Sequence, residues 1–327
     1  MMGSLKRCDV DRLEDLLFFA EIVDHDGFSA AARNLGLQRS KLSRRIAELE
    51  QRMGVRLLQR NTRHISLTSA GEQVYSHARI LAQEARAAFN IASELYGEPR
   101  GVLRVACSST LAANALISVV SRFCRQYPHV RIVINAADQI VDLVSERADL
   151  AFRVSSTPLD DSSLITRVIT PVPMVMAMSA DLLRMRQGKL LLHPSEVPEL
   201  GLIALAAHDG IKKIDFSQSG KNRYRLRHLP RLMCGNMSVL LSAVGAGLGV
   251  AALPRYLCLT AIAHGQLVDA FDPQSEWQPD ASQLYSLMPT RRGVSFTTRL
   301  FLDFATPLLE KIVSAQHSHS LVLPLPA

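Results

Sequence analysis

A short segment of this 327-residue chain gathers side chains whose types suit a nucleic acid. Its polar and cationic members are Gln38, Arg39, Ser40, Lys41, Arg44 and Arg45. Arginine hydrogen-bonds guanine edges and glutamine hydrogen-bonds adenine edges, whereas the other groups mostly contact phosphates. We therefore expect this segment to bind duplex DNA.

The net charge of the chain is concentrated in the same region. Residues 28–66 hold nine basic and two acidic residues, a net charge of +7 that equals the net charge of the whole chain. The remainder is neutral in sum. This distribution indicates a local polyanion-binding module rather than a generally basic protein.

A second group of chemically useful side chains follows predicted strands in the last two thirds of the chain. Its members carry hydroxyl, amide or guanidinium groups: Ser108, Ser109, Thr110, Arg153, Asn236 and Ser238. Backbone N–H groups at helix N-termini bind carboxylates, and arginine pairs with acidic groups. We expect a small anionic effector here, an organic acid. Ordinary helix capping by the serines and a structural ion pair for Arg153 are the alternatives.

Three predicted helices would position the cationic segment. Residues 12–24 carry apolar residues at helical spacing, and a break follows at Asp26-Gly27. Ser29 is the expected N-cap of a short second helix, which ends in a tight turn at Gly36-Leu37. A third helix is expected over 38–53. Its apolar residues fall on one stripe: Leu42, Ile46, Leu49 and Met53. Two short helices joined by a glycine turn, the second cationic on its outer face, make a helix-turn-helix.

A hairpin is expected directly after Gly54, with strands over 55–60 and 64–68. It would form a wing that brings Arg60 and Arg63 to the backbone phosphates. The alternative for the charged segment is a solvated helix face. The helix spacing, the turn, the wing and the localised charge together favour DNA binding.

A long helix is predicted over 69–96, because this range contains no proline and its only glycine is Gly71. Apolar residues recur there at the alternating spacing of a coiled-coil seam: Val74, Ala78, Leu81, Ala85, Ala88, Ala92 and Leu95. The alternative is a helix that lies on its own domain. Residues 97–101 break the helix and are predicted to form a hinge between domains.

The pattern becomes α/β after the hinge. Strands are expected over 102–107, 130–136, 149–154, 164–169, 171–178, 249–253 and 283–288, and helices over 111–126, 138–146, 236–246 and 296–313. Strands that alternate with helices predict a parallel sheet with right-handed crossovers. Residues 212–231 are rich in Lys and Arg and fit no predicted element.

The stretch GFSAAARNLGLQRSKLSRRIAELEQRMGVRLLQRNTRHISLTSAGE resembles the DNA-binding domain of LysR-type transcriptional regulators. The resemblance covers nearly the whole chain and implies an α/β multidomain protein. Its expected parts are a winged helix-turn-helix over 1–68, a linker helix over 69–96, a hinge over 97–101 and a periplasmic-binding-protein-like effector domain over 102–327. In that domain two α/β subdomains would enclose a cleft, the first over 102–170 and 271–327 and the second over 171–270.

The resemblance also implies partners. These are double-stranded promoter DNA with inverted-repeat symmetry, a small-molecule effector and further copies of the chain in a dimer or tetramer. RNA polymerase is left open as a further partner. No cofactor and no membrane are expected, and the protein would regulate transcription in the cytoplasm without catalysing a reaction. The family often has Ser-Gln-Ser-Ala where this chain has Gln38-Arg39-Ser40-Lys41, so the base preference does not carry over.

Several other classes of protein are not expected. The chain has no run of about 18 apolar residues that would span a membrane, and its first residues lack the apolar core of a secretory signal. Five widely spaced cysteines indicate reduced thiols rather than disulfides or a zinc site. Cys107 and Cys234 leave redox sensing open, although small buried hydrophobes are the favoured interpretation. The alternative function is a cytosolic solute-binding protein or an enzyme based on the α/β domain, but no catalytic motif supports it.

Overall fold

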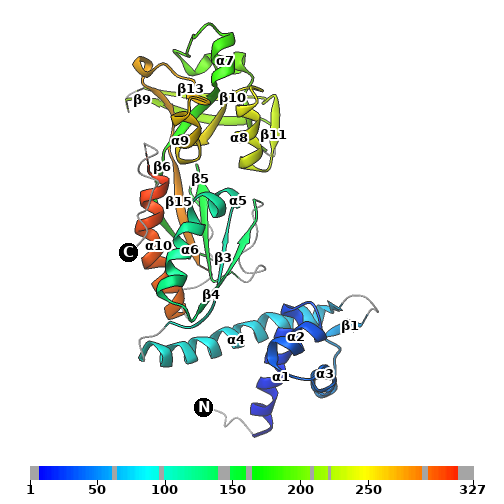
Figure 1. The fold of residues 1–327 in the computed structure, drawn as a ribbon. Coiled ribbons are helices and arrows are strands. Elements are labelled where there is room, and N and C mark those ends of the chain that lie inside the picture. Colours follow the sequence, from blue (N-terminus) through cyan, green and yellow to red (C-terminus); the bar gives the residue numbers. More distant parts are fainter. Residues whose placement is uncertain are drawn as a thin grey trace. The chain divides into compact units, whose positions relative to one another are not determined.

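The computed structural model divides into two compact units, Met1–Tyr96 and Gly97–Ala327 (Figure 1). The structure describes residues 7–60, 65–95, 99–138, 148–159, 164–206, 210–219, 222–288 and 294–315. Arg63 and most of the helix predicted over 138–146 lie outside these ranges. No helix in the described ranges is long and apolar enough to cross a membrane.

The N-terminal unit consists of four helices and one short hairpin. Its elements are α1 (Arg7–Asp24), α2 (Phe28–Leu35), α3 (Arg39–Met53), β1 (Leu58–Arg60), β2 (Ile65–Leu67) and α4 (Ser69–Leu95). β1 and β2 pair antiparallel, with Leu58 opposite Leu67. The core between the helices is apolar and includes Phe19, Ile22, Leu42, Ile46, Leu49 and Leu57. The helix-turn-helix and hairpin are therefore present as predicted.

Two predicted details of this unit are wrong. Helix α2 begins at Phe28, with Gly27 rather than Ser29 as its N-cap, because Ala31 N donates to the carbonyl oxygen of Gly27 (3.1 Å). Gly27 has φ 154°, which favours glycine. Met53 does not continue the apolar stripe, since it is 43% exposed and the left-handed Gly54 (φ 70°) ends the helix directly after it.

The first half of the C-terminal unit is a five-stranded sheet covered by helices. The strand order is β4 (Val130–Ala136), β3 (Gly101–Cys107), β5 (Leu150–Ser155), β15 (Ser282–Met288) and β6 (Ile165–Val172). A continuous helical stretch follows β3, as α5 (Ser109–Leu111), a π-helical turn (Ala112–Leu116) and α6 (Ile117–Gln126). α10 (Phe296–Val313) also packs on this core. The expected parallel sheet is confirmed for β4, β3 and β5, but β15 pairs antiparallel with both β5 and β6.

The second half contains three small sheets. Their strand orders are β12 (Ala251–Pro254), β7 (Met174–Ser179), β13 (Leu267–Asp269); β11 (Leu232–Cys234), β8 (Ile203–Leu205); and β10 (Asn222–His228), β9 (Lys212–Gln218), β14 (Trp277–Pro279). The helices are α7 (Ala180–Met185), α8 (Met237–Gly245) and α9 (Arg255–Ala263), with 3-10 turns at Pro194–Leu200 and Pro273–Ser275. Residues 212–231, which fitted no predicted element, thus contain the strands β9 and β10 and the residues that follow β10.

The chain returns to the first half later than predicted. The expected boundary was residue 271, but β14 still pairs with β9 of the second half. Phe271 and Trp277 are buried in the apolar cluster that contains Met176 and Phe216. Burial of these two large side chains keeps residues 271–279 in the second half, and the return is made by β15.

Gly71 lies where α4 meets the segment before the wing. A Cβ at this position would collide with the carbonyl oxygen of Leu57 and come within 3.2 Å of Leu67. We expect Gly71→Ala to destabilise the N-terminal unit by about 1–3 kcal/mol, because a backbone atom cannot move aside as a flexible side chain can. Thermal unfolding followed by circular dichroism measures this.

The matched control is Gly245→Ala, where the added Cβ meets nothing within 4 Å and φ is negative. It should change the stability by less than about 0.5 kcal/mol. Equal stability of both variants would contradict the close approach at Gly71.

Candidate nucleic-acid interface and effector site

The N-terminal turn and a half of α3 presents the predicted DNA contacts to solvent. The exposed side chains are those of Gln38, Arg39, Ser40, Lys41 and Arg44. Arg44 is 73% exposed and faces Glu48 across one helical turn at 3.8 Å. Gln38 precedes the helix in an extended conformation, and its carbonyl oxygen accepts a hydrogen bond from Leu42 N (3.2 Å). These side chains are therefore available to a partner.

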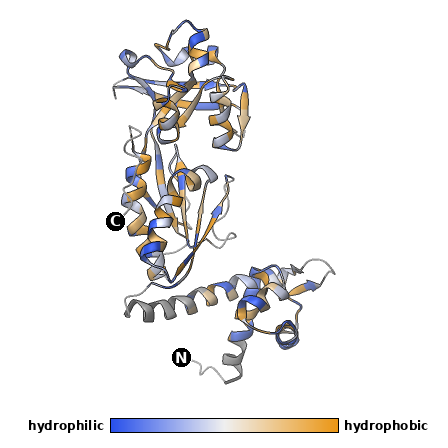
Figure 2. Cartoon of the chain, viewed as in Figure 1, coloured by the Kyte–Doolittle hydropathy of each residue, from blue (hydrophilic) through white to orange (hydrophobic). Residues whose placement is uncertain are grey.

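The opposite side of α3 is anchored in the core. Leu42 and Ile46 are fully buried and Leu49 is 2% exposed. Figure 2 shows α3 down its axis, with mostly hydrophilic colouring. The three apolar residues thus orient a helix that otherwise consists mostly of polar residues.

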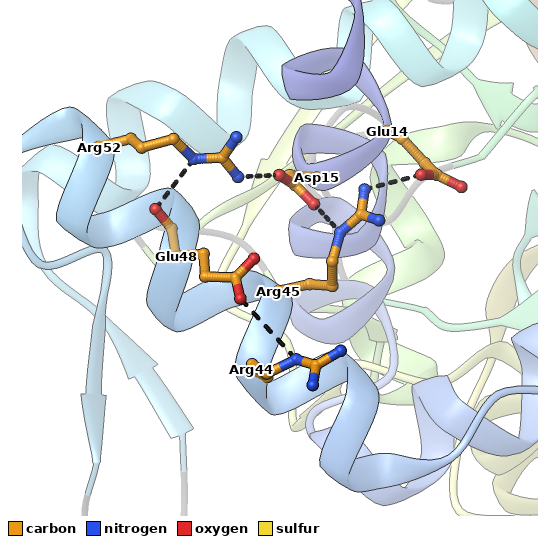
Figure 3. A network of polar contacts seen from close by, with 6 residues as sticks. All are labelled: Glu14, Asp15, Arg44, Arg45, Glu48 and Arg52. Atoms are coloured by element: carbon orange, nitrogen blue, oxygen red, sulfur yellow. Dashed lines mark hydrogen bonds and ion pairs between the residues drawn. The ribbon is translucent and has the colours of Figure 1, made fainter. Parts of the chain in front are cut away.

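A buried carboxylate joins α3 to α1. Asp15 is 1% exposed, and its two oxygens accept hydrogen bonds from Arg45 Nε and Arg52 Nη2 (Figure 3). Arg45 also donates to Glu14 Oε2 (2.7 Å), and Arg52 Nε donates to the carbonyl oxygen of Glu48 (3.1 Å). The hydrogen bond that Arg45 donates to Asp15 is the main cause that raises the pKa of Arg45. Charge-assisted pairing at two positions along α3 therefore sets the rotation of this helix on α1.

A second carboxylate connects α3 to the wing. Glu50 Oε1 accepts hydrogen bonds from the backbone N–H groups of Leu57 (2.8 Å) and Leu58 (3.0 Å). Sequence reasoning missed both Asp15 and Glu50. The available signal was an acidic residue at a buried position of an otherwise apolar helix face, since Asp15 lies between Leu13 and Leu16-Leu17.

The remaining predicted DNA contacts lie elsewhere. Arg45 is on the side of α3 that faces α1, where its guanidinium group also lies 5.3 Å from the centre of the Phe18 ring. Arg60 is the last residue of β1, and Arg63 is outside the described ranges. The structure therefore brings the residues at the start of α3 together but gives Arg45 internal partners.

The predicted seam on α4 divides into two parts. Val74 and Ala78 pack into the core of the N-terminal unit, where Tyr75 also donates to Asp24 Oδ1 (2.6 Å). Leu81 and Ala85 are half-buried. The side chains of Ala88, Ala92 and Leu95 lie outside the described part of the structure. The start of α4 thus follows the alternative interpretation of a helix lying on its own domain.

Five of the six predicted effector residues meet where the N-termini of α5 and α8 approach each other. Thr110 Oγ1 lies 3.4 Å from Ser238 Oγ, and Thr110 is 4% exposed. Ser108 caps α5 by accepting from Leu111 N (3.3 Å), and Asn236 caps α8 by accepting from Val239 N (3.1 Å). Ser108 and Asn236 therefore cap helices, which was the alternative to effector binding for such residues.

Asp138 lies between the two helix N-termini and was not predicted. Its carboxylate accepts hydrogen bonds from Ser109 N (3.0 Å) and from Asn236 Nδ2. It thus joins the segment after β4 to both α5 and α8. A backbone N–H that was expected to hold an effector carboxylate is already bonded to a carboxylate of the chain itself.

Arg153 and the two cysteines complete the predicted set. Arg153 lies on β5 opposite Tyr285, and it has an interaction partner of its own. Burial is the main cause that raises the pKa of the Cys107 thiol to about 11, with a further contribution from Asp138. Cys234 Sγ donates to the carbonyl oxygen of Asn236 (3.2 Å). A thiol with a raised pKa is a poor nucleophile, which favours the structural interpretation of Cys107.

Removal of the buried carboxylate tests the anchoring of α3. We expect Asp15→Ala to destabilise the N-terminal unit by roughly 2–3 kcal/mol. This loss is smaller than that from breaking a fully buried ion pair, because the two freed guanidinium groups can reach water. Urea unfolding measures this loss. Glu48→Ala, which removes the exposed partner of Arg44, should cost no more than about 1 kcal/mol. Equal losses in the two variants would show that Asp15 does not act as an anchor.

Comparisons with known proteins bear on both units. The family model "Bacterial regulatory helix-turn-helix protein, lysR family" matches residues 13–72, and the model "LysR substrate binding domain" matches residues 96–309. The chain is 29% identical over 303 residues to the HTH-type transcriptional regulator PtxR of Pseudomonas aeruginosa, an alignment that covers 93% of this chain and 95% of that protein.

Two full-length solved structures share the fold. CrgA, a LysR-type transcriptional regulator from Neisseria meningitidis, is 26% identical with a TM-score of 0.56. The Vibrio cholerae virulence activator AphB is 25% identical with a TM-score of 0.55. Each comparison covers 90% of this chain and 98% of the other. The chain therefore belongs to the LysR family of transcriptional regulators, whose binding to DNA is modulated by a small effector in the C-terminal domain.

Proposed function

We propose that α3 enters the major groove of promoter DNA and that its first residues contact the duplex. The observation that carries this proposal is the one-sided exposure of Gln38, Arg39, Ser40, Lys41 and Arg44 on a helix whose other side is buried. A helix of this width fits the major groove, with its N-terminal side chains at the base edges. Gln38 and the arginines are the candidates for base contacts, and Lys41 is the candidate for a phosphate contact.

The wing adds the second part of this interface. Arg60 ends β1, and Arg63 lies in the sequence between β1 and β2; we assign both to backbone phosphates on the flank of the groove. We leave Arg45 out of the interface, because its hydrogen bonds to Asp15 and Glu14 occupy its guanidinium group. Its contribution is to hold α3 in place.

We propose that the protein acts as a dimer or tetramer in the cytoplasm and catalyses no reaction. Pairing through α4 would use the seam beyond Ala78, because Val74 and Ala78 are already buried in their own unit. The paired residues would be Leu81, Ala85, Ala88, Ala92 and Leu95. Two copies related by a two-fold axis would present two α3 helices to an inverted repeat. The only support for RNA polymerase as a further partner is the role of the family at promoters.

We propose that the effector binds where α5 and α8 meet, beside Ser108, Ser109, Thr110, Asn236 and Ser238. An organic acid would place its carboxylate at the N-terminus of α5 and would compete there with Asp138. Binding would therefore break the bonds that Asp138 makes with both halves of the C-terminal unit. Arg153 could contribute only if the effector displaced its present interaction partner.

DNA binding is tested on two of the exposed cationic residues of α3. Arg44→Ala should weaken duplex binding by about 1–3 kcal/mol if Arg44 reads a base, and Lys41→Ala should lower the dependence of log K on log salt concentration by about one if Lys41 contacts a phosphate. Fluorescence anisotropy titrations at several salt concentrations measure both. Arg125→Ala is the matched control, an exposed arginine of the other unit. An equal effect of all three substitutions would contradict the interface.

The competition at the effector site is tested with a panel of mono- and dicarboxylic acids in isothermal titration calorimetry. We expect Asp138→Asn to bind the active acids roughly tenfold more tightly, about 1.4 kcal/mol, because a like charge is removed from the site. Thr110→Val should weaken the same acids, because a hydroxyl donor is lost. If Asp138→Asn weakens binding instead, Asp138 contacts the effector directly and the ligand is not a carboxylate.

A further inference from the structure

The sequence contains a second basic segment that the helix-turn-helix does not explain. Residues 212–231 hold seven basic residues and one acidic residue, a net charge of +6 within 20 positions. The chain outside residues 28–66 is therefore neutral only in sum, because acidic residues elsewhere offset this segment. Charge gathered in one element at this density calls for a physical reason.

The structure places four of these seven basic residues on one side of a β-hairpin. β9 and β10 pair antiparallel, with Arg223 opposite Ser217, Arg225 opposite Asp215 and Arg227 opposite Lys213. Successive side chains of a strand point to opposite faces, so Arg223, Arg225 and Arg227 share one face. All three are exposed, whereas Phe216 and Leu226 on the opposite face are buried in the core. We call the side with the three arginines the arginine face. Figure 1 shows β9 and β10 within the C-terminal unit.

Local contacts hold one of the three arginines and leave two for a partner. Arg225 makes a two-point ion pair with Asp215, with Nε–Oδ1 at 2.5 Å and Nη2–Oδ2 at 3.0 Å. Within the described residues, Arg223 and Arg227 make neither a hydrogen bond nor an ion pair. The hairpin thus carries a fixed arginine between two arginines whose donors remain available.

The positions of the charges on this face suit an anionic partner. Arg227 lies directly opposite Lys213 on the neighbouring strand, and Lys213 has an interaction partner of its own. An anion placed over the face would therefore contact mainly Arg223 and Arg227. The shallow pocket of about 310 Å³ at Arg223 and Arg225 is also bordered by Asp215 and Asp280, so it is not a closed site for a small anion. A flat, multiply charged partner fits the face better than a small ligand does.

We propose that the arginine face binds the phosphate backbone of duplex DNA, as a second and sequence-independent contact of this regulator. The inference rests on the proposed function, because the DNA is held first by α3 and is then present at a high effective concentration for the rest of the same chain. Arginine suits this role, since its planar fork donates two parallel hydrogen bonds to a phosphate. The contact raises affinity and its salt dependence without changing the sequence that is recognised.

The experiment uses the full-length protein and a long duplex of mixed sequence, with affinity measured by fluorescence anisotropy over a series of salt concentrations. The variant is Arg223→Gln/Arg227→Gln, which keeps the Arg225–Asp215 pair that shapes the hairpin. We expect the slope of log K against log salt concentration to fall by roughly two for each protomer in contact, because each phosphate contact contributes about 0.9. Thermal unfolding should be unchanged, because both substituted side chains are exposed.

The matched control is Arg131→Gln/Arg167→Gln. Both residues are exposed arginines on the two edge strands of the five-stranded sheet, so the control loses the same charge from the same unit. The control should leave the slope unchanged. An equal fall in both double variants would mean that net charge alone acts, and it would overturn the proposal.

Two further outcomes separate this inference from the proposed function. If Lys41→Ala/Arg44→Ala weakens binding while the arginine-face variant binds as the wild type does, α3 binds DNA and the arginine face does not. That result would assign the face to an acidic segment of a protein or to protection of the edge strand β10 from aggregation. If the wild-type protein binds no duplex at all, the proposed function itself fails.

Discussion

The carboxylate of Asp15 is the interaction on which the arrangement of the N-terminal unit depends. It is almost completely buried, and it is tolerated there because two guanidinium groups of α3 satisfy both of its oxygens. The apolar contacts of Leu42, Ile46 and Leu49 would hold α3 against the core but are not directional. Hydrogen bonds to Arg45 and Arg52, almost two helical turns apart, determine which residues of the helix face outward. The exposed set at the start of α3 follows from this constraint.

A carboxylate has a comparable role in the C-terminal unit, with a different consequence. Asp138 bonds to the N-terminus of α5 and to the side chain that caps α8. It therefore connects two halves that are separate in their cores, since the apolar clusters around Phe123 and around Phe216 are distinct. Asp15 is enclosed by permanent partners. Asp138 bonds to a helix N-terminus, the position that the proposed function assigns to the carboxylate of the effector.

Arginines are arranged in a similar way in the two units. The helix-turn-helix uses cations in two ways, because some of its arginines bind internal carboxylates and others remain exposed. The β9–β10 hairpin repeats this division, with Arg225 held by Asp215 and its neighbours Arg223 and Arg227 exposed. In both places an arginine with a close carboxylate partner fixes the geometry, and the other exposed cations are the candidates for contact with a partner. Formal net charge alone conceals the second site, because acidic residues elsewhere cancel it.

Periodicity and composition were sufficient to predict much of this protein. The three helices, the hairpin and the full extent of α10 follow from patterns within short windows, as does the concentration of cations on α3. The resemblance of residues 27–72 to LysR-type regulators identified the family on the same local basis. These features depend on neighbours within a few turns, and a linear pattern records such neighbours directly.

Tertiary structure alone decided what each residue contacts. Arg45 and Asp15 are 30 positions apart, and Asn236 and Asp138 are 98 apart, so no spacing rule connects them. The late return of the chain through β15 likewise depends on the burial of Phe271 and Trp277 in the second half. Sequence could show that an arginine lies on a helix but not whether a distant carboxylate would bind it. Whether the arginine is bound depends on the burial of the carboxylate, because a charge removed from water needs a partner within the folded chain.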